Sequence, residues 1–247
     1  MITSTPTSRI RQPKSYLFIG PPGTGKTVTA MQFPRPYFLD CDCNLQGPER
    51  YNRDVVKFTT PIHYDQIALD DAGLPVPPEQ RWLRLRAKAL EAVKLPDIDT
   101  IILDSLSHLS VYLADRLMSL QKRSTMEIQD WIPFVSAMIG IFTQLRYSGK
   151  TFILICHEIT ERNSKGDVDE YTPNVSSAKI RDALPGFFTD AYRFYSKAGP
   201  NGPTYYIAPE RTQTSVGLKN SYGMPVELEI PRGKSAFDIL NKYLKLV

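Results

Sequence analysis

The fold of this chain is decided by residues 16–28, which read Tyr16-Leu17-Phe18-Ile19-Gly20-Pro21-Pro22-Gly23-Thr24-Gly25-Lys26-Thr27-Val28. The first four residues are apolar and predict a buried strand. The next eight fit the pattern G-x-x-x-x-G-K-[ST], and the residues after Thr27 continue as a helix until Pro34. A strand, a glycine-rich turn and a helix in this order predict a phosphate-binding loop in an α/β fold.

Each part of this pattern has a chemical task. Glycines let successive backbone N–H groups turn inward around phosphates, and the N-terminus of the next helix adds the positive end of its dipole. Lys26 is expected to reach the β- and γ-phosphates of ATP, and Thr27 to supply a hydroxyl to Mg²⁺. The predicted ATP-binding residues are Gly20, Pro21, Pro22, Gly23, Thr24, Gly25, Lys26, Thr27 and Val28.

A second nucleotide motif is predicted where an apolar run, residues 101–103, ends at Asp104. Such a run is typical of a central parallel strand that is covered on both faces. Asp104 is expected to hold Mg²⁺ through water, beside the hydroxyl of Thr27. The alternative interpretation of Asp104 is an aspartate that caps the following helix.

The base that activates the attacking water must come from another strand. Mechanical ATPases of the AAA+ class carry a glutamate directly after the metal-binding aspartate, and here that position is Ser105. Residues 35–39 predict a second strand, which ends in the acidic group 40–42. Asp42 is therefore predicted to be the catalytic base, with Asp40 as the competing candidate.

Hydrophobic periodicity and turn residues predict the remaining elements. They are a helix over 78–94, a helix over 128–146, a strand over 152–156 ending at His157, a hairpin of 192–195 with 204–207, and a last helix capped by Ser235 that runs through Tyr243. The expected architecture is a mostly parallel central sheet flanked by helices, with a C-terminal antiparallel hairpin. His63 and His108 have no ligand partners at a useful spacing and are assigned no role.

Composition limits the class of protein. A chain of 247 residues with 42% hydrophobic content predicts one large domain over 15–247, preceded by a flexible arm over 1–14. No apolar run approaches the roughly 20 residues of a membrane span, so a cytoplasmic protein is expected. Three cysteines predict reduced thiols, and a net charge of +4 permits a nucleic-acid partner without requiring one.

The chain resembles the RecA superfamily of P-loop ATPases in four motifs. These are the phosphate loop, the acidic strand end at Asp42, the apolar run that ends at Asp104 and Ser105, and a polar sensor at His157. The resemblance covers residues 15–220 and departs from the family where Asp42 replaces a glutamate and His157 replaces a glutamine. Within the superfamily the chain looks most like short phage-type proteins that consist of the ATPase core alone and act with single-stranded DNA in annealing and recombination.

This resemblance implies how the chain works and what it binds. With the superfamily's strand order, the strand ending at His157 would lie between those carrying the phosphate loop and Asp104, so that the imidazole would sense the γ-phosphate. The implied cofactors are ATP and Mg²⁺. The implied partners are single-stranded DNA, further copies of the chain in a ring or filament, and a single-strand-binding protein.

Two segments, 116–130 and 159–178, take the positions of the family's DNA-binding loops. The cations predicted to meet DNA phosphates in and beside them are Arg116, Lys122, Arg123, Arg162, Lys165, Lys179 and Arg181. Acidic residues such as Glu161 and Asp167 dilute the second segment, so a solvated polar loop is an equal alternative.

Residues 211–220 follow the hairpin, where related oligomeric ATPases place basic fingers that reach the nucleotide of a neighbouring subunit. Arg211 and Lys219 are the candidate fingers, with ordinary surface charge as the alternative.

Two other functions stay open at this stage. One is a P-loop kinase of a small acceptor, although the sequence has no compact arginine-rich lid. The other is an AAA+ remodelling or loading ATPase, against which stand Ser105 and a C-terminal hairpin in the place of that class's helical lid.

Overall fold

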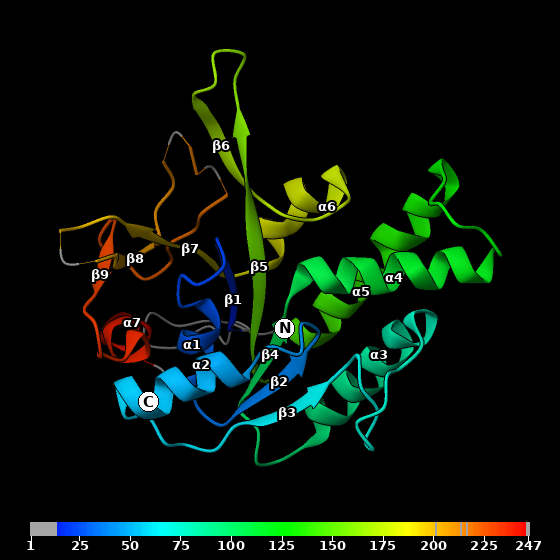
Figure 1. Cartoon of the computed structure of the whole chain (residues 1–247), viewed down its shortest axis with the longest axis horizontal. Helices are drawn as coiled ribbons and strands as arrows, with labels where there is room; N and C mark the ends of the chain where they lie inside the picture. Colours follow the sequence, from blue (N-terminus) through cyan, green and yellow to red (C-terminus); the bar gives the residue numbers. More distant parts are fainter. Residues whose placement is uncertain (1–13, 201, 213, 216, 246–247) are drawn as a thin grey trace, which may run out of the picture.

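A computed structural model of the chain describes residues 14–200, 202–212, 214–215 and 217–245. Within these residues nine strands form a sheet in the order β3-β2-β4-β5-β1-β7-β8-β9, with β6 paired to β5 (Figure 1). The strands are β1 Ser15–Gly20, β2 Pro36–Asp40, β3 His63–Gln66, β4 Thr100–Asp104, β5 Thr151–Arg162, β6 Val168–Pro173, β7 Asp190–Lys197, β8 Thr204–Ala208 and β9 Leu228–Ile230. Of the predicted arm only Lys14 is described, so that prediction lies outside the described residues.

Helices cover both faces of the sheet (Figure 1). They are α1 Lys26–Met31, α2 Gln46–Tyr51, α3 Pro78–Lys94, α4 Leu106–Leu120, α5 Trp131–Arg146, α6 Ala178–Ala183 and α7 Ala236–Leu244, with short π or 3-10 turns at Asn52–Val56, Ile128–Asp130 and Leu184–Phe187. The predicted cap of the last helix is confirmed, because the Ser235 hydroxyl accepts a hydrogen bond from the Asp238 amide at 3.0 Å. Among the described helices, none is long and apolar enough to cross a bilayer.

The continuous apolar runs have a direct explanation in two separate cores. In β1, Leu17 and Ile19 pack on the side of α3, α4 and α5, whereas Tyr16 and Phe18 pack on the side of α1 and α7. Successive side chains of a strand point to opposite faces, so a strand covered on both faces must be apolar at every position. The same alternation holds in β4, where Ile102 faces the α1 and α7 side.

The parallel registers bring the strand ends that carry polar residues to one edge of the sheet. Gly20 of β1 is paired with His157 of β5, and Asp40 of β2 with Asp104 of β4. Since β5 lies between β4 and β1, the strand order expected from the RecA resemblance is observed. The RecA-like α/β class, with its mostly parallel sheet and the antiparallel pair β7 and β8, is therefore confirmed.

One expectation about a strand end and one about a loop are corrected. The strand expected to end at His157 continues to Arg162 and pairs with β6, so most of segment 159–178 is an ordered hairpin followed by α6 rather than a loop. Figure 1 shows this hairpin projecting beyond the rest of the sheet. The apolar run stops at Cys156 because the strand leaves the helix-covered core there, and a two-stranded ribbon no longer needs apolar residues on both faces.

Candidate active site

The glycine-rich turn after β1 has the backbone shape that the motif predicts. Gly20 lies so close to β7 that an added Cβ would stand 2.0 Å from the Phe194 carbonyl oxygen. Gly25, the residue before α1, has φ 93° and ψ 8°, the left-handed region that glycine adopts without a steric cost. These two glycines therefore let the chain turn sharply from β1 into α1, whose N-terminus faces the cavity described below.

Lys26 is the buried cation of the site, with 5% of its surface exposed. Its ammonium donates hydrogen bonds to the carbonyl oxygens of Gly20 at 2.8 Å and Pro21 at 2.7 Å. Burial lowers the pKa of Lys26, and the nearby carboxylate of Asp104 only partly offsets that effect. A charged ammonium held by two neutral carbonyls is well placed to exchange them for phosphate oxygens.

Thr27 and Asp104, the two predicted metal ligands, are in direct contact. The Thr27 hydroxyl donates to Oδ2 of Asp104 at 2.7 Å, and Asp104 is 6% exposed. Burial raises the pKa of Asp104 to about 7, although the hydrogen bond from Thr27 and the charge of Lys26 lower it. A hydroxyl beside one buried carboxylate next to a phosphate-binding turn is an oxygen donor set that suits Mg²⁺, which commonly uses one or two carboxylates together with substrate phosphates.

Asp40 and Asp42, the two candidate bases, have different surroundings. Asp40 is 1% exposed, its Oδ2 has no hydrogen-bond partner among the described residues, and burial raises its pKa to about 6. Burial would also raise the pKa of Asp42, but the close contact with His108, together with the nearby imidazole of His157 and the Ser105 hydroxyl, outweighs it and holds that pKa well below its usual range. Asp42 is therefore fully anionic near neutral pH, and Asp40, whose pKa is about 6, is mostly anionic there as well. A low pKa makes Asp42 a weak proton acceptor, and its role as the base stays a prediction.

Histidines flank Asp42 from two elements. His157 Nε2 lies 3.7 Å from Oδ2 of Asp42, and its buried Nδ1 has no partner among the described residues. His108 Nδ1 lies 2.6 Å from Oδ1 of Asp42, a contact that the sequence analysis missed. The signal available in the sequence was its position in the first turn of the helix that follows Asp104.

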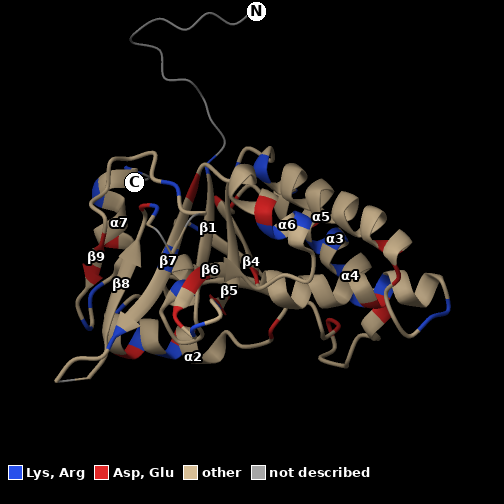
Figure 2. Ribbon diagram, turned by 90° about the horizontal axis from the view of Figure 1, so that it is seen from above, with Lys and Arg blue, Asp and Glu red and all other residues tan. Residues whose placement is uncertain are grey.

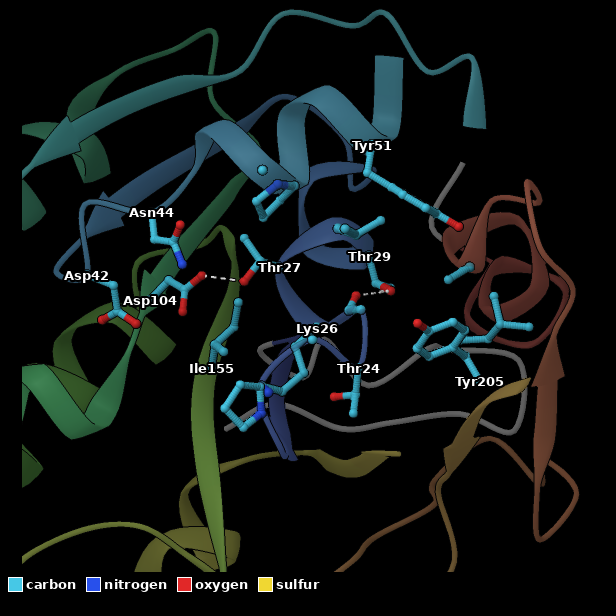
Figure 3. Close-up of a pocket in the computed structure, with 18 of the residues that line it drawn as sticks. Thr24, Lys26, Thr27, Thr29, Asp42, Asn44, Tyr51, Asp104, Ile155 and Tyr205 are labelled. Atoms are coloured by element: carbon cyan, nitrogen blue, oxygen red, sulfur yellow. Dashed lines mark hydrogen bonds between the residues drawn. The ribbon is translucent and has the colours of Figure 1, made fainter. Parts of the chain in front are cut away.

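The cavity beside the loop, about 420 Å³ in volume, has two different ends. One end holds Asp42, Asp104 and the side chain of Lys26, whereas Tyr51 and Tyr205 stand at the other end, beyond the phosphate loop (Figure 3). The residues of this cavity that the sequence analysis missed come from α2 and the residue Asn44 before it, from β5, β8 and β9, and from the segment between β9 and α7 with the first residue of α7. They are Asn44, Gly47, Pro48, Tyr51, Ile155, Tyr205, Ile230, Pro231, Arg232, Lys234 and Ala236, together with Thr29 of α1.

A family model described as "AAA domain" matches residues 12–214 of this chain. The chain belongs to the AAA domain family. Among solved structures, the AAA-domain chain is similar to a KaiC-like protein of the hyperthermophilic archaeon Pyrococcus horikoshii OT3. That similarity has 14% identity and a TM-score of 0.50, and it covers 89% of this chain and 91% of the other.

A second similar structure is the flagellar accessory protein FlaH of Methanocaldococcus jannaschii. It is 11% identical, with a TM-score of 0.43, and the match covers 92% of this chain and 89% of FlaH. No curated protein sequence matches the AAA-domain chain. The match to the Pyrococcus structure supports the fold alone, that of the RecA-like P-loop ATPases.

The candidate fingers of the AAA-domain protein do not line its cavity. The Lys219 ammonium donates to the Phe188 carbonyl at 2.8 Å, and its backbone pairs with Ala191 near the beginning of β7. Lys219 therefore lies at the end of the strands opposite the phosphate loop, and its ammonium is bound by carbonyl groups of its own chain. Arg211 is exposed, and positions 213 and 216 of the finger segment lie outside the described residues.

The candidate DNA-binding cations of the AAA-domain protein lie in different surroundings. Arg116 lies within α4, so the first segment begins as a helix and not as a loop. Arg123 and Arg181 form ion pairs with acidic side chains of the same chain. Arg162 and Lys165 lie at the turn of the β5–β6 hairpin, and Lys122 and Lys179 are exposed. Figure 2 shows basic and acidic positions scattered over the elements. The structure therefore does not gather these cations in one place.

Proposed function

We propose that this P-loop protein of the AAA domain family is a Mg²⁺-dependent ATPase that acts on single-stranded DNA in recombination or strand annealing. The observation that carries the enzymatic part is the contact of Thr27 with Asp104 beside the buried ammonium of Lys26. A hydroxyl, a buried carboxylate and a lysine at a glycine-rich turn suit the phosphates and the metal of a nucleoside triphosphate.

The two ends of the cavity suit the two ends of ATP. The loop N–H groups and Lys26 would hold the phosphates, and Thr27 and Asp104 would hold Mg²⁺, which when bound neutralises charge on the phosphate oxygens. Tyr205 and Tyr51 line the far end, where an aromatic face can pack against a base. Lys234 and Arg232 also line the cavity and offer donors to the ribose or base.

Asp42 acts in this proposal as the general base. It takes a proton from a water molecule, the oxygen of that water forms a bond to the γ-phosphorus, and the bond from the γ-phosphorus to the bridging oxygen breaks to release ADP. The proton then leaves Asp42 for solvent, so the reaction yields ADP, phosphate and a proton. His157 lines the cavity beside Asp42, which suits a sensor of the γ-phosphate.

Single-stranded DNA as the partner is supported by the resemblance to phage-type recombination ATPases and by the projecting β5–β6 hairpin. This hairpin begins in the strand that carries His157 and has Arg162 and Lys165 at its turn. A change at the nucleotide could therefore reach the hairpin along one strand. Assembly into a ring or filament would place a basic finger of one subunit at the nucleotide of the next.

A second candidate function is an ATPase that remodels or loads a protein partner. Two observations favour it: the membership of the AAA domain family, and the side chains of Ile128 and Ile132, which are 89% and 78% exposed within or next to the first proposed DNA segment. Apolar side chains exposed to this degree fit a protein surface better than a phosphate backbone.

ATP turnover with and without single-stranded DNA, measured over a range of salt concentrations, tests the proposal. We expect DNA to stimulate turnover and the stimulation to weaken steeply as salt rises, because phosphate contacts release counterions. The Lys26→Ala variant should lose ATP binding and turnover. Wild-type protein without turnover would refute the ATPase, and turnover indifferent to any DNA but raised by a protein partner would favour the second candidate.

A further inference from the structure

The carboxylate of Asp42 is held unevenly at its two oxygens. Oδ1 accepts hydrogen bonds from the Ser105 amide at 3.2 Å and the Ser105 hydroxyl at 3.0 Å, and the Nδ1 of His108 lies 2.6 Å from it. None of the hydrogen bonds among the described residues ends on Oδ2, and Nε2 of His157 lies 3.7 Å from it, which is beyond hydrogen-bond distance. Oδ1 is therefore fully engaged, and Oδ2 is the oxygen left to accept a proton.

The donors to Oδ1 come from one rigid element. Ser105 immediately precedes α4, and His108 lies three residues later, so the two side chains share one face of the first turn. Leu106 and Leu109 anchor that turn, since both are completely buried in the core below the sheet.

A second contact ties α4 to the same strand end. The Tyr112 hydroxyl, one turn after His108, donates to the carbonyl of Cys41 at 2.6 Å. The amide of Cys41 in turn donates to the carbonyl of Asp104 at 2.6 Å. The chain around Asp42 is therefore held at two successive residues by α4 and by the end of β4.

We propose that His108 is a positioning residue for ATP hydrolysis, which holds Oδ1 of Asp42 so that Oδ2 is directed at the attacking water. This inference rests on the proposed function, in which Asp42 is the base. A free carboxylate rotates about its last side-chain bond, and misplacing a reacting group by about 1 Å can cost on the order of 10²-fold in rate. The bond from His108 also withdraws negative charge, which weakens the base, so the proposal requires the gain in orientation to be the larger effect.

Steady-state kinetics of four variants test the inference. We expect His108→Ala to lower kcat by about 10-fold or more with little change in KM, because His108 does not line the nucleotide cavity. His108→Asn should restore most of the rate, since its amide nitrogen can stand where Nδ1 stands, whereas the nitrogen of His108→Gln lies nearer the position of Nε2. His63→Ala, at an exposed histidine that starts β3, is the matched control and should keep the wild-type kcat.

A double-mutant comparison separates positioning from structure. If His108 acts through Asp42, then Asp42→Asn and the double variant with His108→Ala should have the same kcat. The inference would be overturned if His108→Ala had the kcat of the wild type. It would also be overturned if His108→Ala lowered kcat by the same factor in the Asp42→Asn variant as in the wild type. If His108→Ala fails to fold, the comparison of the Asn and Gln variants decides, and equal rates in those two would count against positioning.

The outcomes also separate this inference from the proposed function. Wild-type protein with no turnover above Lys26→Ala removes both. If the wild-type protein hydrolyses ATP and His108→Ala hydrolyses it at the same rate, the positioning role is refuted and the proposed ATPase activity stands.

Discussion

At the scale of single residues, the site places two kinds of aspartate within one cavity. Asp42 has hydrogen-bond donors on one oxygen and stays charged, whereas Asp104 is buried with the Thr27 hydroxyl as its donor. A buried carboxylate with few donors opposes its own ionisation until a cation arrives. This contrast suits a charged base beside a carboxylate that binds metal.

Asp104→Asn should stabilise the ligand-free protein at neutral and alkaline pH. Burial raises the pKa of Asp104 to about 7, so between about pH 4 and pH 7 the folded protein keeps a proton that the unfolded chain has released. The contribution of Asp104 to stability therefore falls as pH rises through this window, by an amount on the order of a few kcal/mol. Thermal unfolding should show a higher Tm for the variant at pH 8 and a smaller gain at pH 5.

The same variant should lose the stabilisation that Mg²⁺ with ATP gives the wild-type protein. Asp97→Asn, at an exposed aspartate outside the cavity, is the control. Its Tm should stay near that of the wild type at pH 5 and at pH 8. An Asp104→Asn variant that is less stable than the wild type at pH 8 would contradict this account.

Tyr205→Ala should weaken ATP binding more than it weakens binding of inorganic triphosphate. Tyr205 lines the end of the cavity away from Lys26, and stacking of a base on an aromatic ring is worth roughly 1–3 kcal/mol. We expect the Kd for ATP to rise by about 10-fold in calorimetry, with the Kd for triphosphate unchanged. Tyr64→Ala, at an exposed tyrosine of β3, is the matched control. Equal losses for both ligands would place the base elsewhere.

At the scale of elements, the β5–β6 hairpin is one feature that the apolar pattern alone did not reveal, and α4 is another. Within the core, β5 is apolar on both faces, but from Glu158 onward its residues are mostly polar or charged. Pairing with β6 keeps the backbone hydrogen bonds satisfied outside the core, so the strand continues although its hydrophobic signal has ended. Periodicity reports burial, and here burial ends before the strand does.

Replacing both cations at the hairpin turn, Arg162→Ala with Lys165→Ala, should weaken binding to single-stranded DNA of any sequence. Each lost phosphate contact should reduce the slope of log K against log salt by about 0.7. Fluorescence anisotropy over a salt series measures both effects. Arg86→Ala with Lys94→Ala, a pair of equal charge on the exposed face of α3, is the control. An unchanged affinity and slope would exclude the hairpin turn as a DNA contact.

At the scale of the whole molecule, the open question is whether one subunit completes the active site of another. No described residue from the finger segment lines the cavity of its own chain. Such a finger is worth roughly 10³–10⁵ in rate in other ATPases, so a dispersed subunit would hydrolyse ATP slowly.

Mixing two inactive variants should restore turnover if Arg211 acts on a neighbour. Lys26→Ala lacks its own phosphate cation but keeps Arg211, and Arg211→Ala has the opposite defect. In a mixed assembly some interfaces combine an intact loop with an intact finger, so ATPase activity should reappear, and it should rise with total protein concentration. Activity of Arg211→Ala alone equal to the wild type would rule out this role, and a mixture no more active than its parts would rule out action in trans.

What the sequence determined by itself is the local chemistry of the phosphate loop and of the two strands beside it. Residues 15–31 form strand, turn and helix as the motif predicts, because the left-handed backbone of Gly25 and the N–H groups at the start of α1 depend on neighbours along the chain. The apolar runs likewise indicated a sheet covered on both faces.

Only the tertiary structure decided which distant side chains share the cavity. Tyr51, Tyr205 and Arg232 come from three separate segments of the chain, namely α2, β8 and the turn before α7. His108 meets Asp42 because β2 and β4 are neighbours in the sheet and α4 begins where β4 ends. Strand order and register set these distances, and no local residue pattern encodes them. The physical reason is that contacts across a sheet follow from how all the strands pair at once, whereas a turn is shaped by its own few residues.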